Sequence, residues 1–319
     1  MSLRLMALGL TVLVMLMVVR PLYAGDEGRH YIPLLTYRTG AFAGSGIPSA
    51  NGFHDYLTML NVRDGGIGGV KVEIEECETG YKAQKGLECY EATKGKGPLV
   101  YNPFSTGITL QLIAKASVDA IPVLSMGYGL SAAADGEKFP WIFNAPATYW
   151  SQASVIIKYL AGRNNGALKG RKIGFVFLDS GYGREPIPLL SALSERMGFE
   201  LLLLPVGVKD MQNQSSHWLN VRKERPDYVI LWGWGAMTPT AIREAAKIRF
   251  NMENLIGSWW SGSQADVRPA GQAAIGYHAM TFHGARSDVP AFDAIIEHVI
   301  NGSSTFQVGS FRSSFPAMR

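Results

Sequence analysis

The sequence is poor in charged residues and has no basic stripe. Charged side chains make up 18% of its 319 residues, and the formal net charge is +4. An average globular domain has about 25% charged residues. The longest basic cluster, at 222–225, is interrupted by Glu224. A protein that binds nucleic acid gathers its Lys and Arg residues on one face, so we expect no nucleic-acid partner.

Motifs for catalysis and metal binding are also missing. The six histidines stand at no metal-ligand spacing, and no HExxH sequence, P-loop or nucleophile elbow is present. The glycine-rich run at 65–69 precedes a predicted strand instead of following one, so we interpret it as a turn. The sequence gives little support for an enzyme, and we expect no cofactor and no metal ion.

The first 24 residues resemble an export signal in their order. Arg4 precedes an almost wholly apolar run of 15 residues at 5–19, and Ala24 offers a small residue before a polar stretch. This order is typical of a secretory signal peptide, and a membrane span needs about 20 apolar residues. We expect cleavage near Ala24 and a periplasmic mature chain. An uncleaved N-terminal anchor is the alternative.

Cysteine occurs only twice, at Cys77 and Cys89. In an oxidising compartment an isolated pair is read as one disulfide. Closing so short a loop would stabilise the fold by about 3 kcal/mol before strain is subtracted. Two buried free thiols are the alternative. The pair lacks a His or acidic partner at metal spacing, which argues against zinc.

Short apolar runs alternate with helical patterns along the chain. We expect strands near 30–35, 70–74, 99–101, 121–125, 172–178, 201–206, 228–232 and 255–257. We expect helices near 49–64, 83–90, 108–118, 151–160, 183–197, 218–225 and 239–248. Strand and helix in repeated alternation predict parallel sheets covered by helices on both faces.

A break near residues 145–148 divides this pattern into two parts of similar size. The expected fold class is therefore α/β, with two doubly wound parallel-sheet lobes. We expect lobe 1 over residues 25–145 and lobe 2 over 146–275.

Ligands bind outside the carboxyl ends of parallel strands. The loops at these ends are rich in Gly, Ser, Thr, Tyr and Trp; they span 36–46, 77–80, 102–107, 126–131, 179–183, 233–237 and 258–262. Their composition predicts a polar-rimmed aromatic pocket.

Five segments carry a resemblance to a known family. They lie at 37–40 (Tyr-Arg-Thr-Gly), 104–107 (Phe-Ser-Thr-Gly), 121–125 (Ile-Pro-Val-Leu-Ser), 179–183 (Asp-Ser-Gly-Tyr-Gly) and 226–230 (Pro-Asp-Tyr-Val-Ile), the last followed by Gly233. In their order and spacing the chain resembles, from about residue 31 to 299, the periplasmic substrate-binding proteins of ABC transporters, of the leucine/isoleucine/valine-binding (type I) kind. The resemblance implies two lobes joined by three crossing segments, which close over a small ligand.

The resemblance also implies roles for particular positions. Ser105 and Thr106 would hold a ligand carboxylate, and Gly127 with Tyr128 would complete that subsite. Tyr182 would close over the ligand from the second lobe. The candidate ligand-binding residues are Tyr37, Arg38, Ser105, Thr106, Gly127, Tyr128, Tyr182, Trp234, Trp259 and Trp260. The alternative for Tyr128, Tyr182 and Trp234 is ordinary loop packing.

One departure from the family bears on the ligand. Amino-acid binders of this family place an acid near the position of Ser258, Trp259 and Trp260, where it pairs with the ligand ammonium, and this chain has none there. A buried ammonium without its counter-charge is destabilised by several kcal/mol, and cation–π contacts with two Trp rings recover about 0.5–2 kcal/mol. We therefore favour an aromatic or apolar carboxylate over a branched-chain amino acid, with Arg38 as the partner of the carboxylate. Alternatively, Trp259 or Trp260 belongs to the core between the lobes.

A second departure lies after Ile300, where the sequence has no apolar periodicity. Family members continue there with further helices and a third crossing segment. The resemblance therefore implies lobes joined by a hinge, with an incomplete return to lobe 1 over 276–319. We expect a truncated C-terminus that lacks part of lobe 1 and exposes an apolar face.

The expected function is that of an extracytoplasmic receptor. It would be a monomer that captures a small organic molecule and delivers it to an ABC permease in the membrane. One alternative is a sensory binding protein that presents its ligand to a signalling receptor. A secreted α/β enzyme is a remote third reading, because carboxylates distant in sequence can still meet in space.

Overall fold

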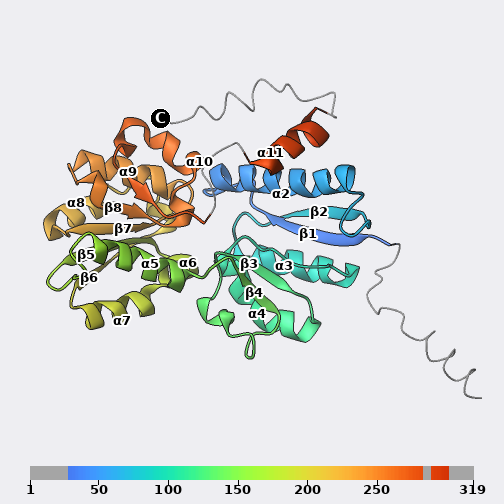
Figure 1. Cartoon of the computed structure of the whole chain (residues 1–319), viewed down its shortest axis with the longest axis horizontal. Helices are drawn as coiled ribbons and strands as arrows, with labels where there is room; N and C mark the ends of the chain where they lie inside the picture. The colour runs from blue at the N-terminus through green and yellow to red at the C-terminus, as the bar shows by residue number, and fades with distance from the viewer. Residues whose placement is uncertain (1–27, 283–288, 302–319) are drawn as a thin grey trace, which may run out of the picture.

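The computed structural model describes residues 28–282 and 289–301. The predicted signal peptide and the C-terminal segment after residue 301 therefore lie outside the described residues. Figure 1 shows two halves side by side, one built around two parallel strand pairs and the other around one five-stranded parallel sheet. The N-terminal half holds β1–β4 with α2–α4, and the C-terminal half holds β5–β9 with α5–α10. This arrangement confirms the predicted α/β fold with parallel sheets.

The N-terminal half contains two parallel strand pairs. β1 (His30–Thr36) pairs with β2 (Val72–Glu78), and β3 (Val123–Met126) pairs with β4 (Ile142–Ala145). Residues 98–102 lie between the pairs and contact both through isolated bridges, Leu34 to Asn102 and Tyr101 to Val123. We predicted a strand at 99–101. It is reduced to bridges because the prolines at 98 and 103 have no N–H to donate.

Helices cover both faces of this first sheet (Figure 1). α2 (Ala43–Arg63) packs on one face, where Ile32, Leu34 and Val72 form a small core. α3 (Ala83–Thr93) and α4 (Thr106–Asp119) pack on the other, around Tyr101 and Ile108. α2 begins six residues before the predicted start, with Pro48 inside its first turns. α11 (Pro290–Ile295) packs against α2.

The C-terminal half has one sheet in the order β6-β5-β7-β8-β9, with every pair parallel. Its strands are β5 (Lys172–Leu178), β6 (Glu200–Val206), β7 (Tyr228–Trp232), β8 (Leu255–Gly257) and β9 (His278–Ala279). β5 and β7 are buried along almost their whole length. Strands buried on both faces read as continuous apolar runs, which is why the sequence reveals them clearly.

The helices of this half are α5 (Tyr149–Gly162), α6 (Gly181–Arg184), α7 (Ile187–Met197), α8 (Ser215–Glu224), α9 (Met237–Lys247) and α10 (Gln264–Val267). The helix that we predicted over 183–197 is two helices, α6 and α7. Pro186 separates them because its ring cannot continue a helix from the preceding turn.

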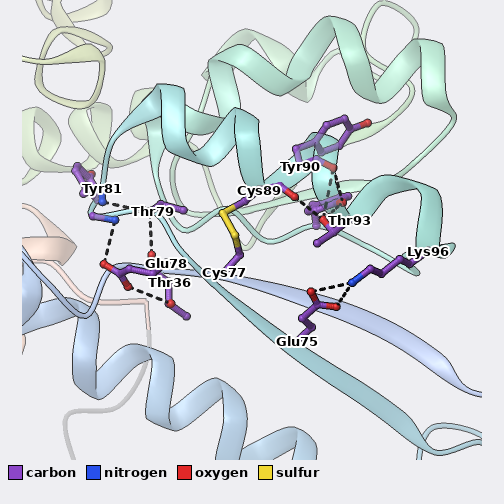
Figure 2. The surroundings of a disulfide bond; sticks show 12 residues. Thr36, Glu75, Cys77, Glu78, Thr79, Tyr81, Cys89, Tyr90, Thr93 and Lys96 are labelled. Atoms are coloured by element: carbon purple, nitrogen blue, oxygen red, sulfur yellow. Dashed lines mark hydrogen bonds and ion pairs between the residues drawn. A yellow bond between two sulfur atoms is a disulfide. The ribbon is translucent and has the colours of Figure 1, made fainter.

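The predicted disulfide is present. Cys77 at the end of β2 is bonded to Cys89 in α3, with a Cα–Cα distance of 5.9 Å. Figure 2 shows the bond close to Glu78 and Thr79, at the start of the loop that leads to Tyr81. The described part of the chain contains no helix with the length and apolar character needed to cross a membrane.

Candidate functional site

Two adjoining cavities lie between the halves of the molecule. The inner cavity, of about 10 Å³, is lined by Tyr81, Phe104, Ser105, Thr106, Tyr128, Tyr149, Tyr182, Trp234 and Trp260. The outer cavity, of about 380 Å³, is lined by the loops at 40–42 and 80–83 and by Ser105, Gly107, Leu178, Ser180, Gly181, Tyr182 and Val208. Tyr81, Ser105 and Tyr182 line both. The structure thus brings Ser105 and Tyr182, from different halves of the molecule, to one shared site.

Ser105 and Thr106 lie where α4 begins. The Ser105 Oγ atom caps the helix by accepting a hydrogen bond from Ile108 N at 3.4 Å, as a serine at this position commonly does. The Thr106 Oγ1 atom accepts from Gly129 N at 3.2 Å and lies 3.1 Å from the Tyr149 hydroxyl. Both residues are buried. Their hydroxyls, at the N-terminus of α4, form the polar end of the inner cavity.

Tyr182 approaches the same cavity from α6. Its hydroxyl donates to the Gly233 carbonyl at 3.0 Å and lies 3.0 Å from Ser258 Oγ, so its hydrogen bonds stay within the C-terminal half. Burial raises the pKa of Tyr182 well above its usual value, against a smaller lowering by Ser258. The side chain therefore remains a neutral phenol.

Tyr128 has a structural hydrogen-bond role as well as lining the inner cavity. Its hydroxyl accepts from Phe104 N at 2.6 Å and contacts Asn102 and the Leu124 carbonyl. The ring lies 6.4 Å from that of Trp260. Trp234 and Trp260 also face Phe104, at ring distances of 6.0 and 5.5 Å. These contacts join loops from both halves into one aromatic wall.

Trp259 and Trp260 donate their indole N–H groups to the same acceptor, the Gly127 carbonyl, at 3.0 and 3.2 Å. Trp260 lines the inner cavity, whereas Trp259 lines neither cavity and stacks against Tyr149. Trp259 is thus a core residue between the halves, which is the alternative that the sequence left open. Gly127 supplies the carbonyl oxygen that accepts both indole N–H groups, and it does not line either cavity.

Arg38 lies elsewhere. Its guanidinium binds both carboxylate oxygens of Glu76, at 2.8 and 2.6 Å, and also Asn51 at 2.7 Å. The hydrogen bonds that Arg38 donates to Glu76 raise the pKa of Arg38 above its usual value. Arg38 lines neither cavity, and its role as the partner of a ligand carboxylate stays a prediction. Tyr37 is buried behind the site, 4.9 Å from the ring of Tyr81 and 5.8 Å from that of Phe104.

Sequence reasoning missed Tyr81, Phe104 and Tyr149. Tyr81 and Phe104 have backbone φ angles of +62° and +48°, in a region that non-glycine residues rarely adopt and that often marks functional loops. Both line the inner cavity. The one available signal was that each belongs to a loop at the carboxyl end of a strand or bridge.

The Tyr81 loop is held by Glu78. Its carboxylate accepts from the backbone N–H groups of Arg38 and Gly80 at 2.8 and 3.1 Å, and from the Thr39 hydroxyl at 2.8 Å. Desolvation acts to raise the pKa of Glu78, but these hydrogen bonds outweigh it and lower the pKa. The carboxylate therefore ties the loops after β1 and β2 together at the edge of the outer cavity.

The site is nearly free of charge. Among the described residues that line the two cavities, Lys82 is the only one with a charged side chain. In the described ranges, 28–282 and 289–301, no group of three or more His, Cys, Asp or Glu residues is arranged to hold a metal ion. The geometry suits capture of an organic molecule between hydroxyl groups and aromatic rings.

Comparison with known proteins agrees with a fold that binds a small molecule between two halves. A family model described as periplasmic binding protein matches residues 30–299. A solved structure described as an ABC transporter permease from the Pseudomonas fluorescens group is 40% identical, with a TM-score of 0.76; the match covers 87% of this chain and 68% of that one. No match was found among curated protein sequences.

Two more distant structures share the fold. A branched-chain amino acid ABC transporter protein from Thermus thermophilus, with bound valine, is 20% identical, with a TM-score of 0.72 over 85% of this chain and 71% of that one. A solute-binding protein of an ABC transporter from Rhodopseudomonas palustris, in complex with benzoate, is 16% identical, with a TM-score of 0.69 over 86% of this chain and 74% of that one.

Proposed function

The chain belongs to the periplasmic binding protein family, and we propose that it captures an aromatic or apolar monocarboxylate and delivers it to an ABC permease. The family consists of binding proteins of ABC transporters and not of enzymes. The observation that carries the choice of ligand is the absence of any acidic side chain among the described residues lining the two cavities.

The polar end of the site suits a carboxylate. The first turn of α4 presents N–H groups and the hydroxyls of Ser105 and Thr106, and a helix N-terminus favours a negative charge. The relative from Rhodopseudomonas palustris that was solved with benzoate supports a ligand of this class. The relative solved with valine supports an amino acid instead.

The rest of the site suits an apolar body. Phe42, Tyr81, Leu178 and Val208 surround much of the outer cavity. An amino acid bound there would leave its ammonium group without a carboxylate partner, which is destabilising by several kcal/mol in a buried site. A singly charged carboxylate avoids this loss.

The proposed receptor has two lobes, residues 25–145 and 146–275, with 276–319 returning toward the first. Its leader, residues 1–24, would be removed near Ala24 on export to the periplasm. The ligand would be trapped as the lobes close, with Tyr182 brought against it. The two cavities between the sheets support this mode of capture.

A thermal-shift screen tests the proposal. The purified chain is melted with benzoate, phenylacetate, octanoate, leucine and phenylalanine. A ligand at 100 times its Kd stabilises the folded state by about 2.7 kcal/mol. We expect the carboxylates without an ammonium group to raise Tm most and to be recovered unchanged. A larger shift with leucine contradicts the ligand class, and consumption of the ligand contradicts a receptor.

A further inference from the structure

Among the described residues that line the outer cavity, one has a charged side chain, and we propose that it sets the charge of the ligand. The ammonium group of Lys82 is the counter-charge for the ligand carboxylate, so that the receptor selects singly negative, apolar molecules over zwitterions. This inference rests on the proposed function and deepens it.

Lys82 is held at the edge of the cavity by its backbone. It is the residue before α3, with its N–H donating to the Thr79 carbonyl and its carbonyl accepting from Gly86 N, both at 3.0 Å. Glu78 and the Cys77–Cys89 bond flank the same loop (Figure 2). The position of the side chain at the cavity wall therefore follows from a fixed loop.

The ammonium group of Lys82 has no carboxylate partner within the described residues. Two other cations near the site are already paired. Arg38 binds Glu76, and Arg184 binds Asp179 at 2.5 Å. Among the described residues that line the two cavities, Lys82 is thus the cation that remains available to an incoming anion.

The surroundings of Lys82 reinforce this selection. A zwitterion would bring an ammonium group into a cavity whose described walls hold one cation and no anion. The attraction between its carboxylate and Lys82 would be offset by the repulsion between its ammonium group and Lys82. A monocarboxylate gains the attraction alone, and its apolar part packs on Phe42, Tyr81 and Leu178.

The size of the two cavities indicates where the ligand body lies. The inner cavity, at about 10 Å³, has room for about one water molecule. The outer cavity, at about 380 Å³, falls in the range of small-molecule sites. The ligand therefore occupies the outer cavity, with its carboxylate at the part of the wall that Lys82 and Ser105 both line.

The test pairs a charge change on the protein with one on the ligand. Lys82→Gln is compared with Lys85→Gln, which alters an exposed lysine of the same helix that lines neither cavity. Each protein is titrated calorimetrically with benzoate, phenylacetate and octanoate, and with the corresponding amides. Because exposed ion pairs are weak, we expect Lys82→Gln to lose about threefold to fivefold in affinity for the acids.

The amides should bind both variants as they bind the wild type. Added salt should weaken binding of the acids to the wild type and to Lys85→Gln, but not to Lys82→Gln. Equal losses for acids and amides, or no loss for either, overturn the role of Lys82 and leave the proposed receptor intact. If none of the acids binds the wild type, the proposed function itself fails.

Discussion

The hydroxyl of Ser45 lies 2.7 Å from a carboxylate oxygen of Asp266, 221 positions further along the chain. Ser45 belongs to α2 and Asp266 to α10, so this buried hydrogen bond joins the two halves of the molecule. Burial raises the pKa of Asp266 to about 6, against smaller lowering effects of the Ser263 and Ser45 hydroxyls. The folded protein therefore binds this proton more tightly than the unfolded chain does.

The contribution of Asp266 to stability should decrease as pH rises from about 4 to about 6. In this window the unfolded chain has already released the proton that the folded protein keeps, so the folded state is favoured more at the lower pH. Asp266→Asn removes this dependence. We expect the Tm of Asp266→Asn minus the Tm of the wild type to increase by several degrees as the pH is raised from about 4 to about 6.

Melting curves followed by circular dichroism measure this effect. Asp135→Asn, a change at an exposed position, is the matched control and should track the wild type at every pH. A constant difference in Tm between Asp266→Asn and the wild type would show that Asp266 has an ordinary pKa.

Replacement of Tyr182 should separate the role of its ring from that of its hydroxyl. Tyr182→Ala removes a wall of both cavities, and we expect affinity to fall by about tenfold or more and stability by about 3–5 kcal/mol. Tyr182→Phe keeps the ring and loses only the bonds to Gly233 and Ser258, so it should lose about 1 kcal/mol of stability and little affinity. Calorimetry and urea unfolding measure the two effects, and an equal loss of affinity in both variants contradicts a role for the ring.

Loss of the Cys77–Cys89 bond should weaken both the fold and the site. The bond holds α3 against β2, and the short loop between them carries Gly80, Tyr81 and Lys82 to the outer cavity. We expect the double Ser variant to lose about 2–4 kcal/mol in urea unfolding and to bind its ligand less tightly. Added reductant should affect the wild type alone. Unchanged affinity would mean that the hydrogen bonds of Glu78 are enough to hold the loop.

Gly183 should not tolerate a side chain. A Cβ atom there would overlap the backbone carbonyl of Leu178, so Gly183→Ala forces β5 and α6 apart. We expect a loss of several kcal/mol, seen as a lower urea midpoint. Gly162→Ala, in α5 with open space around it, is the matched control and should be neutral or stabilising by about 0.5–1 kcal/mol. Similar midpoints for the two variants would contradict the overlap.

The sequence indicated the strands well because β5 and β7 are buried on both faces and carry few polar residues. The rule that the ends of parallel strands meet at one edge of a sheet indicated the loops at 102–107 and 179–183. The resemblance to the binding proteins singled out Ser105, Thr106 and Tyr182 within these loops.

The remaining site residues depend on tertiary contacts. Arg38 follows β1, and the register that places Thr36 beside Glu78 also brings Glu76 within reach of its guanidinium. No local pattern reveals that pairing. Tyr81 and Phe104 reach the cavity through left-handed backbone conformations, and nothing in their immediate sequence requires these conformations.

The shared Gly127 carbonyl has a consequence for how fast a solute is exchanged. If the lobes open as the proposed mode of capture requires, the Gly127 oxygen loses two indole donors in the same step, and the rings of Phe104, Tyr128 and Trp260 become exposed to water together. We expect such an opening to have a substantial barrier. We expect the residence time of a captured molecule to depend on this barrier more than on the strength of the contacts between the molecule and the protein.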